Sequence, residues 1–127
     1  MDRHESTRVV ERFWAAMAAS DFRGAGDLLH DDYVLDWPQS GERIRGRSNF
    51  VAINEAYPAA GRWRIELHRL VADGDAVATD VTVTDGVRHD RVITFSEVRD
   101  GRIVRQVEYW PDPFDPAPWR EQWVQRA

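Results

Sequence analysis

Apolar residues in the first third of the chain recur at intervals of three and four positions, which is the period of an α-helix. Between residues 3 and 19 they form one stripe, made of Val9, Val10, Phe13, Trp14 and Met17. A shorter and weaker stripe of the same period follows the helix-capping residue Asp21, and another begins near residue 48. The pattern therefore predicts three helices, over residues 3–19, 22–29 and 48–57.

The second half of the chain changes to an alternation of apolar and polar residues, which is the period of a β-strand. The dipeptide Asp-Gly, which favours tight hairpin turns, separates four such runs, over residues 62–72, 75–84, 88–99 and 102–110. A shorter run over 33–37 and a polar loop over 39–46 stand before the third helix. Helices followed by an antiparallel meander predict an α+β fold in a single domain of residues 1–127.

Each strand of the predicted meander has one apolar face and one mixed face of short acids, hydroxyls, Val and Trp. An apolar face normally packs against helices while the mixed face meets water. The scarcity of long charged side chains on the mixed face favours the opposite arrangement, in which this face lines a ligand pocket. In that case the apolar face needs a second subunit, in a homodimer, to cover Val81, Val83, Ile93, Phe95, Val107 and Tyr109.

Composition removes several classes of function. The chain has 127 residues, a net charge of −5 and no cysteine, which excludes disulfides, thiolate metal sites and cysteine nucleophiles. All 17 basic residues are arginine, so no lysine can form a Schiff base. The acidic balance makes nucleic acid and anionic membranes poor partners, and the N-terminus has no signal-peptide pattern, which predicts a cytoplasmic protein.

Two stretches of the sequence resemble a known superfamily. They are V-V-E-R-F-W-A-A-M-A-A-S-D-F-R-G-A-G-D-L-L-H-D-D-Y-V-L-D-W-P at residues 9–38 and D-G-R-I-V-R-Q-V-E-Y-W at residues 100–110. They resemble the nuclear transport factor 2-like superfamily, and in particular its SnoaL-like proteins, ketosteroid isomerases and limonene epoxide hydrolases. The resemblance implies helices against a curved antiparallel sheet, a pocket in the cone between them, and dimerisation through the sheet.

The residues that ketosteroid isomerases use are not retained in the same form. By the resemblance, their helix tyrosine falls on Phe13 and their second oxyanion acid on Thr94. Their catalytic base falls on Trp37, one residue after Asp36. Ordinary ketosteroid isomerase chemistry is therefore not expected.

The relay of the epoxide hydrolases is also incomplete. Their asparagine and arginine positions fall on Asp36 and Asp80, and their tyrosine position falls on Val34. Thr82 occupies the position of the acid beside the arginine, and only the last acid is kept, as Glu108.

Three carboxylates remain as a candidate catalytic site, Asp36, Asp80 and Glu108. If all three face one apolar cone, desolvation and mutual repulsion raise the pKa of at least one of them. Such a carboxyl transfers protons without a metal or another cofactor. The alternative is that some of these acids face water or pair with arginine. The expected substrate contacts are the walls Trp37 and Trp110 together with Phe13, Trp14, Thr82, Thr94 and Gln106.

The tail over residues 111–127 is rich in proline, which excludes a helix interior or a central strand. It is expected to end in a short helical turn, from which Trp119 and Trp123 cover the end of the cone.

The leading hypothesis is a cofactor-independent acid–base enzyme of isomerase, lyase or cyclase type, with Glu108 as its principal acid–base residue. Its substrate is expected to be small and apolar, polycyclic compounds included. Two alternatives stay open: a non-catalytic module of the same fold that binds a small ligand or dimerises, and an epoxide hydrolase with a rearranged acid cluster. No metal or cofactor is expected.

Overall fold

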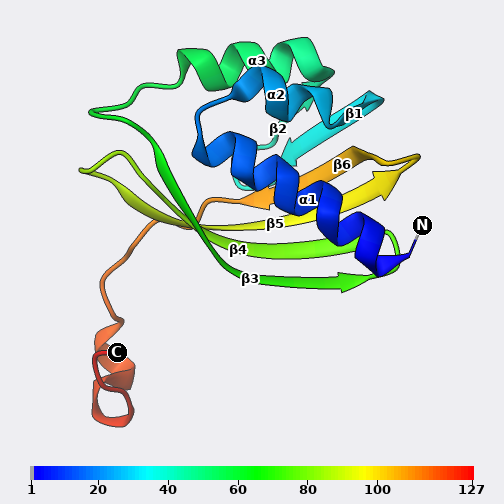
Figure 1. The fold of residues 1–127 in the computed structure, drawn as a ribbon. Helices are drawn as coiled ribbons and strands as arrows, with labels where there is room; N and C mark the ends of the chain where they lie inside the picture. Colours follow the sequence, from blue (N-terminus) through cyan, green and yellow to red (C-terminus); the bar gives the residue numbers. More distant parts are fainter. Residues whose placement is uncertain (1) are drawn as a thin grey trace.

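Six strands form one curved sheet, and three helices lie against its inner face (Figure 1). A computed structural model describes residues 2–127 of the chain. The helices are α1 (Arg3–Ala18), α2 (Phe22–Asp27) and α3 (Arg47–Ala56), and a 3₁₀ helix, η1 (Pro118–Trp123), lies near the C-terminus. The strands are β1 (Leu29–Trp37), β2 (Glu42–Arg45), β3 (Arg64–Asp73), β4 (Ala76–Thr84), β5 (His89–Arg99) and β6 (Arg102–Tyr109). The predicted α+β class with a curved sheet is confirmed.

The strand order in the sheet is β2-β1-β6-β5-β4-β3. Strands β3 to β6 form the predicted antiparallel meander. β1 lies on the other side of β6 and runs parallel to it, and β2 pairs antiparallel with β1. The strand β2 corrects the expectation of a polar loop over residues 39–46, because Ile44 is only 7% exposed and anchors this short strand to the core.

The helix α1 begins as its N-terminal sequence dictates. The carboxylate of Asp2 accepts hydrogen bonds from the backbone N–H groups of His4 and Glu5, at 2.8 and 3.0 Å. Its apolar stripe is buried against the sheet, through Val9, Val10, Phe13 and Trp14. The helix α2 is shorter than predicted, because Leu29 is the first residue of β1 and pairs with Ile103 of β6.

The strand β4 turns its apolar face toward the helices. Val77, Thr79, Val81 and Val83 are buried there, while Asp80 and Thr82 face outward. The register with β5 accounts for this, since Thr79 lies opposite Thr94 and Val81 opposite Val92, and directly opposed residues share a face. The expectation that Val81 and Val83 belong to the outer apolar face is therefore wrong.

The outer face of the sheet keeps part of its predicted apolar character. Phe95 is 52% exposed and Tyr109 is 37% exposed, and their rings meet edge to face with centroids 6.3 Å apart. Ile93 and Val107 lie on the same face and are partly exposed.

Residues 111–127 leave the end of β6 and extend away from the sheet, on the side opposite the helices (Figure 1). Trp119 and Trp123 are 74% and 70% exposed, so the expectation that they cover the end of the cone is wrong. Across residues 2–127, no helix combines the length and the apolar character that crossing a membrane requires.

Candidate functional site

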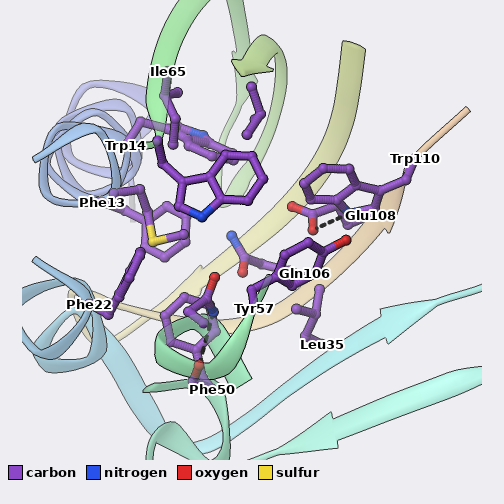
Figure 2. A pocket seen from close by; sticks show the side chains of 14 residues that line it. Phe13, Trp14, Phe22, Leu35, Phe50, Tyr57, Ile65, Gln106, Glu108 and Trp110 are labelled. Atoms are coloured by element: carbon purple, nitrogen blue, oxygen red, sulfur yellow. Dashed lines mark hydrogen bonds between the residues drawn. The ribbon is translucent and has the colours of Figure 1, made fainter. Parts of the chain in front are cut away.

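A cavity of about 60 Å³ lies between the helices and the inner face of the sheet (Figure 2). The helical side is lined by Phe13, Trp14, Met17, Phe22, Phe50, Asn54 and Tyr57. The sheet side is lined by Leu35, Ile65, Val83, Gln106 and Glu108, with Trp63 and Trp110 beside the strand ends. Among the described residues that line this cavity, Glu108 is the one charged side chain. An apolar wall with a few placed polar groups is typical of a small-molecule site.

Three aromatic rings from separate segments meet at one end of the cavity. Tyr57, just after α3, packs edge to face with Trp63 at a centroid distance of 5.7 Å and stacks with Trp110 at 6.3 Å. Beyond them lies a more open hollow, which Trp37, Glu108 and Trp110 help to line. Glu108 therefore stands at the boundary between the cavity and this outer hollow.

Glu108 is 8% exposed, and its carboxylate accepts three hydrogen bonds. Its Oε1 accepts from the indole Nε1 of Trp37 at 3.1 Å and from that of Trp110 at 2.8 Å. Its Oε2 accepts from the hydroxyl of Thr94 at 2.7 Å, which is possible because Thr94 lies opposite Glu108 in the pairing of β5 with β6. Three donors from three positions hold the carboxylate in one orientation.

Gln106 stands two residues before Glu108 on the same face of β6 and is 1% exposed. The hydroxyl of Tyr33 donates to Gln106 Oε1 at 2.6 Å, and Gln106 Nε2 donates to Ser96 Oγ at 3.1 Å. Burial, and then the negative charge of Glu108, raise the pKa of Tyr33 well above its usual value, so its hydroxyl remains a donor. The amide of Gln106 is thereby oriented, and its second N–H is not used by either of these hydrogen bonds.

Two more polar side chains of the lining are oriented by hydrogen bonds. The indole Nε1 of Trp14 donates to Thr79 Oγ1 at 3.1 Å, which fixes the ring plane that faces the cavity. The Nδ2 of Asn54 donates to the carbonyl oxygen of Phe50 at 2.9 Å, which leaves Asn54 Oδ1 as an acceptor.

Asp36 and Asp80 lie on the outer face of the sheet. Arg43 donates to both carboxylate oxygens of Asp36 at 2.6 and 3.0 Å, and Arg105 adds a contact of 3.1 Å. Arg43, with help from Arg105, holds the pKa of Asp36 below its usual value. Asp80 accepts from Arg91 at 2.5 and 2.9 Å, which lowers its pKa. The prediction that the three carboxylates converge in the pocket is therefore wrong, because arginines on neighbouring strands bind two of them.

The other predicted substrate contacts divide between the two faces. Phe13, Trp14, Gln106 and Trp110 line the cavity, while Trp37 and Thr94 hold Glu108. Thr82 faces outward, with its hydroxyl 2.6 Å from His68 Nε2, so the expected contact of Thr82 with substrate is wrong. The rearranged acid cluster that an epoxide hydrolase of this kind requires is not assembled. No group of three or more His, Asp and Glu side chains within residues 2–127 is placed to hold a metal ion.

Several lining residues were not predicted from the sequence. Phe50, Asn54 and Tyr57 fall at positions i, i+4 and i+7, which places them on one side of α3 and its end. This spacing is the signal that could have identified them, because it places a polar side chain, Asn54, on the same side as two aromatic residues. The pattern does not set the strand residues Leu35, Ile65 and Val83 apart from ordinary core positions.

Comparisons with known proteins agree with this fold and cavity. The family model described as the SnoaL-like domain matches residues 10–106. A crystal structure of a proposed ketosteroid isomerase from Kribbella flavida is 31% identical, with 99% of this chain and 92% of that chain covered and a TM-score of 0.91. An NTF-2 like protein of unknown function from Burkholderia xenovorans is 34% identical, with 100% and 98% covered and a TM-score of 0.82. Comparison with curated protein sequences gives no match.

An LEH-like epoxide hydrolase from M. tuberculosis is 29% identical, with 86% of this chain and 84% of that chain covered and a TM-score of 0.70. The chain therefore belongs to the SnoaL-like family of the nuclear transport factor 2-like superfamily, as the resemblance implied. The Kribbella flavida and Burkholderia xenovorans structures also follow this chain through its C-terminal segment, since they cover 99% and 100% of it.

Proposed function

We propose that this protein is a cofactor-independent acid–base enzyme that moves a proton within a small, largely apolar carbonyl compound. The observation that carries the proposal is the position of Glu108, the one charged side chain in the described lining of an otherwise apolar cavity. A buried, oriented carboxylate is suited to accept and return a proton. Gln106 supplies an oriented amide donor on the same face of the same strand.

The proposed reaction uses these two side chains in sequence. A substrate carbonyl oxygen accepts a hydrogen bond from Gln106 Nε2. A carboxylate oxygen of Glu108 removes a proton from the adjacent carbon, and the C–H electron pair forms a carbon–carbon double bond while the carbonyl π pair moves onto oxygen. The protonated Glu108 then returns the proton to the same carbon or to the end of a conjugated system, which restores the carboxylate.

The spacing of Gln106 and Glu108 supports this assignment. Alternate residues of a strand lie about 7 Å apart along its axis. One carbonyl group with its adjacent carbon, flanked by two contacts of about 3 Å, spans such a separation. The remaining substrate atoms contact the rings of Phe13, Trp14 and Trp110, which supply apolar surface.

The test is the exchange of carbon-bound hydrogen for deuterium in D₂O. A panel of small ketones and β,γ-unsaturated ketones is incubated with the protein, and NMR follows the signal of the protons beside the carbonyl. We expect at least one compound to exchange or isomerise. In Glu108→Gln, which keeps the shape and removes the proton acceptor, the rate is expected to fall by about 10²–10⁴-fold.

The matched control is Asp80→Asn, the same carboxylate-to-amide change on the outer face, which is expected to leave the rate unchanged. Equal rates in Glu108→Gln and the parent protein would refute the assignment of Glu108. The absence of exchange across the whole panel would refute the proposed chemistry.

A second candidate function is the capture of a small organic cation without catalysis. It is favoured by the combination of one carboxylate with the ring faces around it, since aromatic rings and a negative charge both attract ammonium groups. Calorimetric titration with tetramethylammonium separates the two candidates. Binding that disappears in Glu108→Gln favours the capture of a cation. Neopentyl alcohol, a neutral molecule with a similar tert-butyl shape, is the control ligand.

A further inference from the structure

The last residues of the chain form a stiff arm, defined here as residues 111–127. Four of its first eight positions are proline, in the sequence Pro-Asp-Pro-Phe-Asp-Pro-Ala-Pro. Proline fixes its own backbone and restricts the preceding residue to extended conformations, which favours a stiff, extended stretch here. At about 3.1 Å per residue, eight such residues carry η1 roughly 25 Å from the end of β6.

The arm holds the most exposed aromatic side chains of the part of the chain that the structure describes. The exposed fractions are 83% for Phe114, 74% for Trp119, 70% for Trp123 and 51% for Val124. None of these four side chains belongs to the hydrophobic core or to the partly buried residues that pack against it. Scattered exposed apolar residues are normal, but a segment that presents several together is typical of a surface that another molecule covers.

The direction of the arm points to the surface that receives it. The arm leaves the sheet on the side opposite the helices (Figure 1), which is the side of the outer sheet face. That face carries the exposed side chains Phe95, Tyr109 and Val71, at 52%, 37% and 59% exposure. One chain therefore bears two unpartnered apolar surfaces on the same side of its sheet.

We propose that the arm binds a second copy of this chain, so that each copy lays its arm against the partner's outer sheet face. The exchange is reciprocal, as a twofold dimer requires, and it covers both apolar surfaces at once. This goes beyond dimerisation through the sheet alone, because here the arm is the element that holds the partner. It does not depend on the reaction that the cavity performs.

The area available agrees with a stable dimer. Aromatic side chains bury roughly 150–250 Å² each, so the exposed parts of Phe114, Trp119 and Trp123 offer about 450 Å² per arm. Two arms and the surfaces that they cover amount to roughly 1,800 Å², within the standard size of stable protein interfaces.

The test is sedimentation velocity on the full chain from 1 to 100 µM. Trp119 and Trp123 are exposed in the single chain, so Trp119→Ser/Trp123→Ser is expected to fold normally, which far-UV circular dichroism checks. We expect a dimer for the parent protein and a dissociation constant raised about 100-fold or more in this variant. Phe95→Ser, on the receiving face, is expected to weaken the dimer as well.

The matched control is Glu121→Ser/Gln125→Ser, which changes two exposed polar positions of the same arm and is expected to leave the dimer unchanged. A parent protein that stays monomeric at 100 µM would overturn the proposal. So would a dimer that the loss of both arm tryptophans leaves as tight as before, since the partner would then be held by the sheet alone.

Discussion

The hydrogen bond between Tyr33 and Gln106 permits a quantitative test of the site's construction. Both residues are 1% exposed, and the tyrosine hydroxyl lies 2.6 Å from Gln106 Oε1. Tyr33→Phe removes the donor and keeps the ring, which packs edge to face with Phe50 at 5.7 Å. The amide oxygen is then buried without a partner, at a cost of about 1–3 kcal/mol.

The assay is urea unfolding followed by tryptophan fluorescence. With a slope of about 2 kcal/mol/M, the midpoint is expected to fall by about 0.5–1.5 M while the slope stays constant. Proton exchange on the substrate is also expected to slow, because Gln106 loses the contact that orients its amide. Tyr109→Phe, the same change on the outer face, is the control and is expected to stay within about 0.5 kcal/mol of the parent.

A double-mutant cycle isolates the contact. Gln106→Leu in the Tyr33→Phe background replaces both polar partners, and the double variant is expected to be more stable than the sum of the two losses predicts. The reasoning fails if Tyr33→Phe unfolds at the parent midpoint. It also fails if the two substitutions are strictly additive, because the residues would then act independently.

Three further predictions concern separate parts of the structure. Backbone N–H donors hold the pKa of Asp85 at about 2, below its ordinary 3.8, so its contribution to folding is complete above pH 3.8 and is lost as the pH falls through 2. Asp85→Asn is therefore expected to be less stable at pH 7, and urea midpoints should converge with those of the parent between pH 4 and pH 2. Val81→Thr places a hydroxyl at a fully buried site on the inner face and is expected to cost about 1–3 kcal/mol in thermal unfolding. Thr82→Val, one residue further on the outer face, should stay within about 0.5 kcal/mol. Thr94→Val removes the 2.7 Å donor to Glu108 and is expected to cost about 1.5–3 kcal/mol by the same measurement, and a smaller loss would mean that the contact is not formed.

The local elements of this fold were predictable because their causes are local. The helical stripe of α1 and the Asp-Gly turns of the meander each depend on residues close in sequence. The face that β4 turns to the helices was not predictable, because it depends on the register that places Thr79 opposite Thr94. The strand β2 was missed because its evident apolar anchor is a single residue, Ile44, in a polar run.

The candidate site was likewise predictable only in part. Gln106 and Glu108 share one side of β6, and Trp110 follows the strand at the same spacing, so period-two alternation alone groups the three. The ion pair that holds Asp36 on the outer face depends on a cross-strand neighbour, since Arg43 lies directly opposite Asp36 in the pairing of β1 with β2. Such a partner becomes visible only when the pairing is known.

The parallel pairing of β1 with β6 has a consequence for the time course of folding. The contacts between these strands join residues far apart along the chain: Tyr33 and Gln106 are separated by 73 positions, and Trp37 and Glu108 by 71. Contacts of such long range form late and slowly, because the intervening loop must close first. Until β6 arrives, the edge of β1 that it will cover is an open template for other chains, a state that favours aggregation. We therefore expect refolding yield to depend on protein concentration, and the cavity to be completed only in the last step of refolding.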